Sequence, residues 1–332
     1  MDTSVMITLG FLVFAIVMFA WEKIPLSITA MVVAVGLHLS GVLSAKEAFA
    51  GFVDPNVLLF MGMFVIGEAF FATGVAVGVG NVVHKFAKTE TSLLVAVMMI
   101  TGILSGFLSN TGTAAVLIPV IIGICKKSGF KQTKLLMPLV FAAAMGGNIS
   151  LIGAPGNMIA QAGLQQAGLG SFGFFDYGLV GLPILIVGTI FYATIGKRFL
   201  PDTPSHQPDG AFEGNDDYSH VPSWKKWTSA LVLILTVGAM IFEKQLGVKL
   251  YVSAWVGALV LVATNVISES AAVRSIDMKT IMLFAGSMAL GDAMVKTGTG
   301  SVIADLIVNS LGASPSPIVV LVVIFVLGVF MT

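Results

Sequence analysis

The chain has 332 residues, of which 57% are hydrophobic and 10% charged, and its mean hydropathy is +0.99. This composition lies far outside the range of soluble domains, so it predicts an all-α polytopic protein of the cell (plasma or inner) membrane. The formal net charge is zero, and no nucleic-acid partner is expected. The single cysteine, Cys125, excludes an internal disulfide, and the sequence has no Cys/His cluster that would suggest a structural metal.

Apolar runs give the expected helices in chain order. Runs close to the roughly 20 residues of a membrane-spanning helix lie at 5–21, 25–43, 55–72, 174–196, 228–243, 250–267 and 278–295. Shorter or interrupted runs lie at 92–108, 112–125, 135–147, 157–168 and 316–332. The first run lacks a basic n-region and a small-residue cleavage site, so we expect a retained helix rather than a signal peptide.

Basic residues set the expected topology. Lys85 and Lys88 precede the segment 92–125, and Lys126, Lys127 and Lys131 follow it. Loops rich in Lys and Arg stay in the cytoplasm, so this segment should enter the membrane and return as a re-entrant hairpin. The same threading places 13 of the 17 Lys and Arg residues in the cytoplasm and the N-terminus outside.

The polar stretch Ser109-Asn110-Thr111 forms the expected tip of this hairpin. Non-helical backbone at membrane depth requires protein or water to satisfy its polar groups. The helix that ends at the tip offers carbonyls, and the helix that begins there offers N–H groups. Ser105, Ser109 and Asn110 would supply oxygen ligands for an alkali cation, and Thr111 with the following N–H groups would receive an anion. The alternative is a structural role, in which these residues form a hydrogen-bonding patch between helices.

A second interruption follows between Met145 and Asn157. Three of its glycines precede Pro155, which does not favour a continuous helix. We interpret it as another midplane break whose carbonyls complete the cation site, with tight helix packing as the alternative. Neither interruption contains Arg, Lys, Asp or Glu. An anion would then depend on co-bound cations for positive charge, which predicts cation-coupled anion uptake.

A pattern of residues occurs twice, at a constant offset of 224 positions. The matched residues are Gly62, Gly67-Glu68-Ala69 and Thr73-Gly74 in the first copy and Gly286, Gly291-Asp292-Ala293 and Thr297-Gly298 in the second. An internal repeat explains the whole set better than chance. Under the topology above the copies run in opposite directions, and inverted repeats with broken helices are typical of secondary transporters.

The repeat defines the expected domain organisation. The first repeat covers 1–200, with the re-entrant hairpin at 92–125 and the broken segment at 135–168. A Pro-, Gly- and Asp-rich cytoplasmic linker covers 201–226, and an incomplete second repeat covers 227–332. The counterpart of the hairpin tip would begin shortly after Thr332. We therefore expect the second repeat to be truncated and the complete protein to continue for about a hundred residues.

Two ionisable residues occupy equivalent repeat positions. Glu68 and Asp292 are candidates for coupling carboxylates, because ionisable residues in membrane segments are functional candidates by default. Asp292 has Lys296 one turn later, so an ion pair at the membrane interface is an equal alternative to a proton relay.

At these residues the chain resembles the divalent anion:sodium symporter family of the ion transporter superfamily. Its Ser-Asn-Thr tip matches Ser109-Asn110-Thr111, and its second broken segment matches Gly153-Ala154-Pro155-Gly156-Asn157. The resemblance implies a homodimer with an elevator-type cycle. It implies a sodium site of Ser105, Ser109, Asn110 and the Gly153 carbonyl, and a substrate site of Asn110, Thr111, Ala154, Pro155 and Asn157. Ala154 and Gly156 depart from the family's usual Ser/Thr and Pro.

The expected function is therefore a sodium-coupled symporter that imports di- or tricarboxylates or sulfate, with sodium as the co-transported ion. The alternatives are a cation/proton antiporter or an oxyanion (arsenite-type) exporter on the same scaffold. A membrane hydrolase is disfavoured, because the sequence has neither a His-Glu-x-x-His pair nor a Gly-x-Ser-x-Gly elbow. A channel fits paired broken helices less well than alternating access does.

Overall fold

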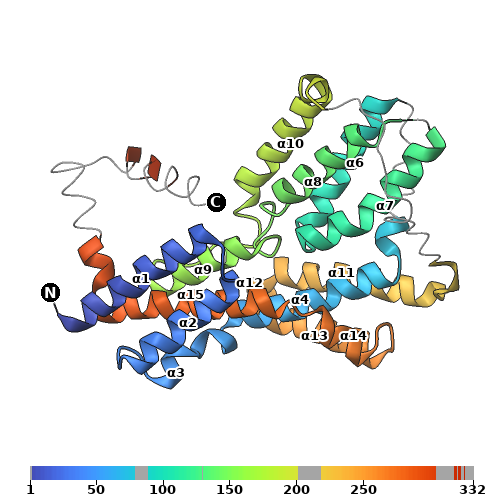
Figure 1. Ribbon diagram of the computed structural model, residues 1–332. Helices are drawn as coiled ribbons and strands as arrows, with labels where there is room; N and C mark the ends of the chain where they lie inside the picture. Colours follow the sequence, from blue (N-terminus) through green and yellow to red (C-terminus); the bar gives the residue numbers. More distant parts are fainter. Residues whose placement is uncertain are drawn as a thin grey trace. The chain divides into compact units, whose positions relative to one another are not determined.

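The computed structural model describes residues 2–78, 89–128, 130–200 and 218–303, together with 318, 319, 321, 322 and 325 (Figure 1). Every regular element within these ranges is a helix, which confirms the predicted all-α class. Three predicted features lie wholly or mostly outside them. These are the basic residues Lys85 and Lys88 before the hairpin, the linker up to residue 217 and the run at 316–332.

The helices follow the predicted apolar runs. Among the described residues, four helices are long and apolar enough to cross a membrane: α1 (Thr3–Trp21), α4 (Pro55–Ala72), α11 (Ser223–Ile241) and α15 (Met278–Thr297). Shorter apolar helices are α2 (Leu26–Leu39), α6 (Glu90–Ser105), α7 (Asn110–Ser128), α8 (Thr133–Gly146), α10 (Gly178–Thr194) and α13 (Leu250–Ala263). The remaining α-helices are α3 (Ala45–Ala48), α9 (Pro155–Gln166), α12 (Glu243–Leu246) and α14 (Glu269–Ser275).

The end of the predicted linker overlaps the start of a helix. The linker was expected to reach residue 226, but α11 already begins at Ser223. Pro222 precedes the helix with a φ of −57° and a ψ of 139°, so its ring fixes an extended residue at the helix start. The polar residues that follow, Lys225 and Lys226, therefore belong to the first turns of a helix rather than to a linker.

The chain divides into two compact units. One consists of Met1–Val57 and Met278–Thr332, and the other consists of Leu58–Asp277. The expected repeat boundary at residue 200 comes from matching residues in the sequence, and the division into compact units does not test it. It therefore stays a prediction.

In the first unit, α2 packs along α15 and against α1. Its core contains the buried side chains of Val33, Leu37 and Ala289. Gly286 lies at the crossing of α15 with α2, where a Cβ would overlap the carbonyl group of Ala30. The glycine thus allows the two helix backbones to approach closely, as small residues do between membrane helices.

An ion pair joins α3 to the end of α15 in the same unit. Glu47 completes a capping box, in which the Ser44 N–H donates to Oε2 of Glu47 at 2.7 Å. The Lys296 ammonium donates to both oxygens of Glu47, at 2.9 and 2.8 Å. These bonds, followed by those from Ser44, lower the pKa of Glu47 to about 2. Lys296 therefore pairs with Glu47, and not with Asp292 as the sequence spacing suggested.

Replacing Glu47 by glutamine should lower the thermal stability only slightly, because the pair is exposed to solvent. The folded-state pKa lies below the ordinary value of 4.5, so the contribution is present above that value and disappears as the pH falls through about 2. Melting temperatures of the two proteins should therefore differ equally at pH 7 and pH 5 and converge in strong acid. A difference that grows on acidification would contradict this assignment.

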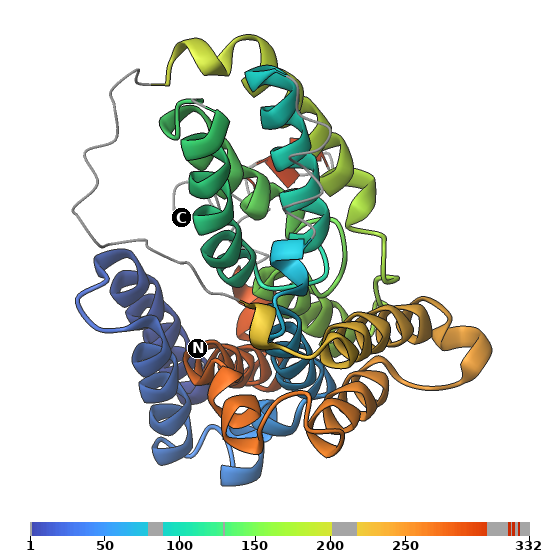
Figure 2. The same cartoon turned by 90° about the vertical axis from the view of Figure 1, so that its right-hand side faces the viewer.

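In the second unit, α6, α8 and α10 pack together, and α7 packs on α8 (Figure 2). Their shared core includes the buried residues Leu93, Met98, Leu139 and Leu185. At Gly146 of α8 a Cβ would overlap the backbone of Gly102 in α6. This glycine–glycine crossing brings the end of α8 close to the last turn of α6, and so brings the two predicted interruptions together.

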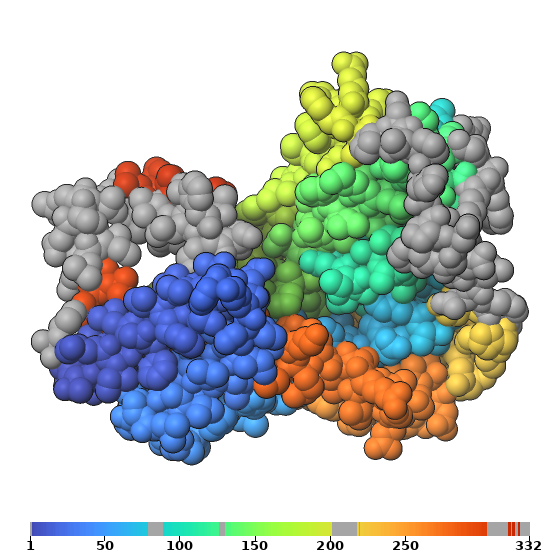
Figure 3. Space-filling view, viewed as in Figure 1, coloured from blue at the N-terminus to red at the C-terminus, as the bar shows by residue number. Residues whose placement is uncertain are grey.

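α10, yellow-green in Figure 3, presents large apolar side chains on its outer face. Leu179 is 80% exposed and Val187 is 65% exposed. An apolar face of this kind is expected to contact lipid in a chain that crosses the membrane several times.

The two copies of the repeated pattern have the same local structure. Thr73 after α4 and Thr297 at the end of α15 each donate their hydroxyl to the carbonyl oxygen four residues earlier, at 2.7 Å in both cases. The glycine that follows is left-handed in both, with a φ of +75° at Gly74 and +73° at Gly298. Glycine adopts this conformation without strain. The two helices therefore end in the same way, with a threonine hydroxyl bonded to the preceding turn and a left-handed glycine after it.

The helix crossings of the two copies also correspond. Gly62 of α4 lies against Ala254 of α13, just as Gly286 of α15 lies against Ala30 of α2. Ala30 and Ala254 differ by the same 224 positions as the two glycines. The glycine of each copy therefore packs on the alanine of the other. The opposite orientation of the copies in a membrane stays a prediction.

Candidate functional site

The predicted hairpin tip, which we continue to call the hairpin tip, lies where α6 ends at Ser105 and α7 begins at Asn110. Ser109 caps α7, because its hydroxyl accepts a hydrogen bond from the N–H of Gly112 at 3.1 Å. The helix break predicted from the polar stretch is thus present, and α7 starts at the middle residue of Ser109-Asn110-Thr111. The tip places the C-terminus of one helix beside the N-terminus of the next.

Oxygen atoms from three segments surround the side-chain amide of Asn110. The Oδ1 position of Asn110 lies 2.6 Å from the Ser105 hydroxyl, 3.0 Å from the carbonyl oxygen of Gly153 and 3.2 Å from that of Ala143. The Ser105 hydroxyl, which is fully buried, also lies 2.7 Å from the Ala143 oxygen and donates to it. We call these four groups, from Ser105, Asn110, Ala143 and Gly153, the oxygen cluster. Each of its members is uncharged.

The second interruption separates α8, which ends at Gly146, from α9, which begins at Pro155. Two side chains hold this broken segment in place. The Asn157 amide donates to the carbonyl oxygens of Gly147 and Ser150, both at 2.9 Å. The Ser150 hydroxyl donates to the carbonyl oxygen of Gly106 through a short hydrogen bond, which ties the break to the hairpin tip. The oxygen cluster therefore depends on both interruptions.

Replacing Asn157 by aspartate should destabilise the protein, because two buried carbonyls lose their donor at about 1–3 kcal/mol each. A matched control is Tyr177→Phe, which removes one hydrogen bond from the same neighbourhood, the 2.8 Å bond from the Tyr177 hydroxyl to the Asn157 carbonyl. Thermal unfolding in detergent should show a clearly larger loss for the aspartate variant. Equal losses would show that the Asn157 amide does not hold the break.

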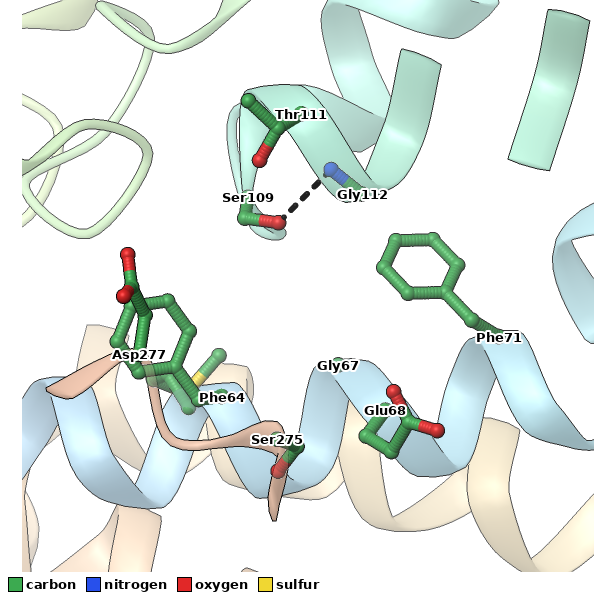
Figure 4. Close-up of a pocket in the computed structure, with 10 residues that line it drawn as sticks. Phe64, Gly67, Glu68, Phe71, Ser109, Thr111, Gly112, Ser275 and Asp277 are labelled. Carbon is green, nitrogen blue, oxygen red and sulfur yellow. Dashed lines mark hydrogen bonds between the residues drawn. The ribbon is translucent and has the colours of Figure 1, made fainter. Parts of the chain in front are cut away.

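A cavity of about 290 Å³ lies beside the hairpin tip in the second unit. Figure 4 shows Ser109, Thr111 and Gly112 on one side of it and Glu68 with Phe71 of α4 on the other. The lining also includes Met63, Phe64, Gly67, Ser275 and Asp277. The cavity thus combines hydroxyls and the first turn of α7 with two carboxylates and an apolar wall.

Comparison with known proteins decides the family. The profile of the citrate transporter family matches residues 16–332, nearly the whole chain. The chain belongs to the citrate transporter family. The match confirms the resemblance to anion transporters, and it places the chain in a transporter family rather than in an enzyme family.

Several relatives of this citrate transporter family member are named as uncharacterized transporters. YfbS, an uncharacterized transporter of Escherichia coli, is 33% identical over 211 residues, which are 63% of this chain and 35% of that protein. An uncharacterized transporter of Haemophilus influenzae is 25% identical over 319 residues, 90% of this chain and 67% of its own length. The match to YfbS, like that to the Synechocystis protein sll0640 at 33% of its length, spans about a third of the relative.

Three of the four residues predicted for the sodium site lie together. Ser105, Asn110 and the Gly153 carbonyl meet in the oxygen cluster. Ser109 is engaged as the cap of α7 and lines the cavity instead. Its role as a sodium ligand stays a prediction.

The residues predicted for the substrate site surround the two helix starts. Thr111 is exposed and lines the cavity, whereas Ala154 and Pro155 form the start of α9. Ala154 is extended, with a φ of −141° and a ψ of 144°, and has no side-chain group to cap the helix. The amide nitrogen of Asn157 is committed to the backbone of the break. Contact with a substrate stays a prediction for all of them.

The two proposed coupling carboxylates belong to different units. Glu68 lines the cavity of the second unit, where Asp277 is a second carboxylate. Asp292 lies on α15, in the first unit. The sequence analysis did not place Asp277 in a site. Its position directly before an apolar run gave no signal of a shared cavity.

Sequence reasoning also missed Ala143 and Ser150. Ala143 contributes a backbone carbonyl, and a carbonyl carries no signature in the side-chain sequence. Ser150 had a detectable signal, since a serine among the glycines of a broken membrane segment requires a hydrogen-bond partner.

Proposed function

We propose that the protein is a secondary transporter that imports di- or tricarboxylates, or sulfate, together with sodium ions. The oxygen cluster at Asn110 is the observation that carries this proposal. Membership of the citrate transporter family supports a carboxylate as the transported anion.

The chemistry of the cluster favours sodium over a proton or a divalent ion. A hydroxyl, a carboxamide and two backbone carbonyls provide hard oxygen atoms, none of which titrates near neutral pH. A proton would require a titratable group, and sites for calcium or magnesium normally include carboxylates. Neutral oxygen ligands are suited to a monovalent cation.

The anion is assigned to the side of the tip that faces the cavity. Thr111 supplies a hydroxyl there, and the first turn of α7 supplies N–H groups at a partially positive helix end. Pro155 begins α9 after the second break, so a second helix start is available to a second carboxylate. A sodium ion in the adjacent oxygen cluster would add the positive charge that the tip lacks.

Alternating access is assigned to an elevator-type movement in a homodimer with inverted repeats. The likeness of Ser109-Asn110-Thr111 to the symporter tip supports this assignment, as do the matching ends of α4 and α15. Reciprocal crossings, in which each repeat's glycine meets the other's alanine, are what a two-fold relation between repeats produces.

The test is uptake of labelled citrate, succinate and sulfate by the complete protein reconstituted in vesicles. Replacing external sodium by choline should reduce uptake of at least one of these anions to the level of protein-free vesicles. Uptake that is equal in sodium and choline would overturn the proposal.

A cation/proton antiporter is the second candidate, because Glu68 and Asp277 line the same cavity as the hairpin tip. Two carboxylates there oppose the entry of a free anion and would suit exchange of a cation for protons. Sodium-driven proton movement in vesicles without any anion, abolished by Glu68→Gln in a folded variant, would favour this candidate. An oxyanion exporter would instead show anion extrusion.

A further inference from the structure

The amide of Asn110 has two orientations that differ in chemistry but not in shape. The nitrogen and oxygen of a carboxamide occupy nearly equal volumes, and rotation about the last side-chain bond exchanges them. A Cβ on Gly147 would lie 2.7 Å from both amide atoms, so the glycine leaves just enough room for this planar group. The exchange requires no movement of the helices.

With the oxygen turned toward the cluster, donors are in deficit. Four oxygen atoms, from Asn110, Ser105, Ala143 and Gly153, then lie together. The Gly147 N–H donates to the Ala143 oxygen at 3.2 Å, and the Ser105 hydroxyl is the one side-chain donor in the oxygen cluster. That hydroxyl can donate to Oδ1 of Asn110 at 2.6 Å or to the Ala143 oxygen at 2.7 Å, but not to both. Buried oxygen atoms without donors are costly, so this orientation suits a bound cation.

With the nitrogen turned inward, donors and acceptors balance. The two amide hydrogens can bond the Gly153 oxygen at 3.0 Å and the Ser105 oxygen at 2.6 Å. The Ser105 hydroxyl then donates to the Ala143 oxygen at 2.7 Å. Three hydrogens meet three acceptors, and no cation is required.

We propose that the Asn110 carboxamide replaces the cation when the cation leaves. Its oxygen ligates sodium in the loaded transporter. In the cation-free one its nitrogen donates to the Gly153 carbonyl and to the Ser105 hydroxyl, which in turn donates to the Ala143 carbonyl. This inference rests on the proposed sodium-coupled function. As a consequence, the buried oxygens of the cation-free transporter stay hydrogen-bonded. Its empty site can then return across the membrane and bind sodium and substrate again.

The variant Asn110→Asp separates the two roles, because aspartate keeps the oxygen ligands and loses both amide hydrogens. Net uptake needs the return of the cation-free transporter, whereas exchange with sodium and substrate on both sides does not. In proteoliposomes the ratio of net uptake to exchange should fall by about tenfold or more in the variant, because without the cation a buried carboxylate would face the Gly153 carbonyl with no amide hydrogen between them. Equal loss or equal retention of both activities in a folded variant would overturn the inference.

Asn157→Asp is the matched control, because it removes the same two amide hydrogens from the carbonyls of Gly147 and Ser150. It should reduce net uptake and exchange in parallel. A selective loss of net uptake in this variant would overturn the inference, because it would show that the effect is not specific to the oxygen cluster.

A measurement on the unsubstituted protein does not depend on how either variant folds. Side-chain amide signals of ¹⁵N-asparagine-labelled protein in micelles identify Asn110 by their absence in Asn110→Gln. Without sodium its amide hydrogens should exchange slowly with deuterium, and sodium, but not choline, should accelerate the exchange. If sodium leaves the rate of deuterium exchange unchanged while uptake depends on sodium, this inference alone is overturned. If uptake does not depend on sodium, the proposed function itself is overturned.

Discussion

Replacing Gly147 by alanine should raise the sodium concentration for half-maximal uptake by about tenfold or more, a change of about 1.4 kcal/mol in binding free energy. The new Cβ would lie 2.7 Å from both Nδ2 and Oδ1 of Asn110. Relief of that overlap requires the amide to leave its place, and the oxygen cluster then loses the member that joins its other three groups. A sodium titration of uptake in proteoliposomes measures the effect.

Gly156→Ala provides the control in the same interrupted region. Gly156 lies in the first turn of α9, and nothing stands within 4 Å of its added Cβ. This variant should leave the sodium dependence unchanged. If the two variants shift the sodium titration equally, the amide of Asn110 is not a member of the sodium site.

A large loss of stability is expected from Gly146→Ala. Its Cβ would overlap the backbone oxygen and Cα of Gly102, where α8 crosses α6. No side-chain rotation relieves a clash with backbone, so the two helices must separate. Overpacking of this kind costs about 1–3 kcal/mol or more. Thermal unfolding of the purified variant should show at least that loss, or the variant should fail to accumulate.

The control for this prediction is Gly163→Ala in α9. The added Cβ meets nothing within 4 Å, and alanine favours a helix over glycine by about 1 kcal/mol. Its stability should equal or exceed that of the unsubstituted protein. A loss similar to that of Gly146→Ala would mean that any alanine at a helical glycine is harmful, and the crossing would explain nothing.

The sequence was sufficient to predict the helices because apolar composition and helix-stop residues determine them. The run at 55–72 matches α4, which begins at Pro55 and ends before Thr73 and Gly74. Proline suits the first turn of a helix, and glycine adopts the left-handed conformation that ends one. The arm predicted to start at 112 begins instead at Asn110, because Ser109 caps it. A capping bond depends on local geometry that hydropathy does not report.

The candidate site was predicted in part. The resemblance to the symporter family grouped Ser105, Asn110 and Gly153, and these residues lie together in the oxygen cluster, whereas their role as sodium ligands stays a prediction. It missed the Ala143 carbonyl, whose contribution depends on the close crossing of α8 with α6 rather than on a residue type. The ion pair of Glu47 with Lys296 was missed for a similar reason, since its partners are separated by 249 positions. Contacts between distant segments follow from packing, which sequence spacing does not encode.

Binding of radioactive sodium to the purified protein tests the central claim most directly, because it requires neither transport nor a known substrate. The account predicts saturable binding that choline does not displace and that is weakened by about tenfold or more in Ser105→Ala and Gly147→Ala, but unchanged in Gly156→Ala. Absence of saturable binding, or binding that Ser105→Ala and Gly147→Ala leave unchanged, would contradict the assignment of the oxygen cluster as a sodium site.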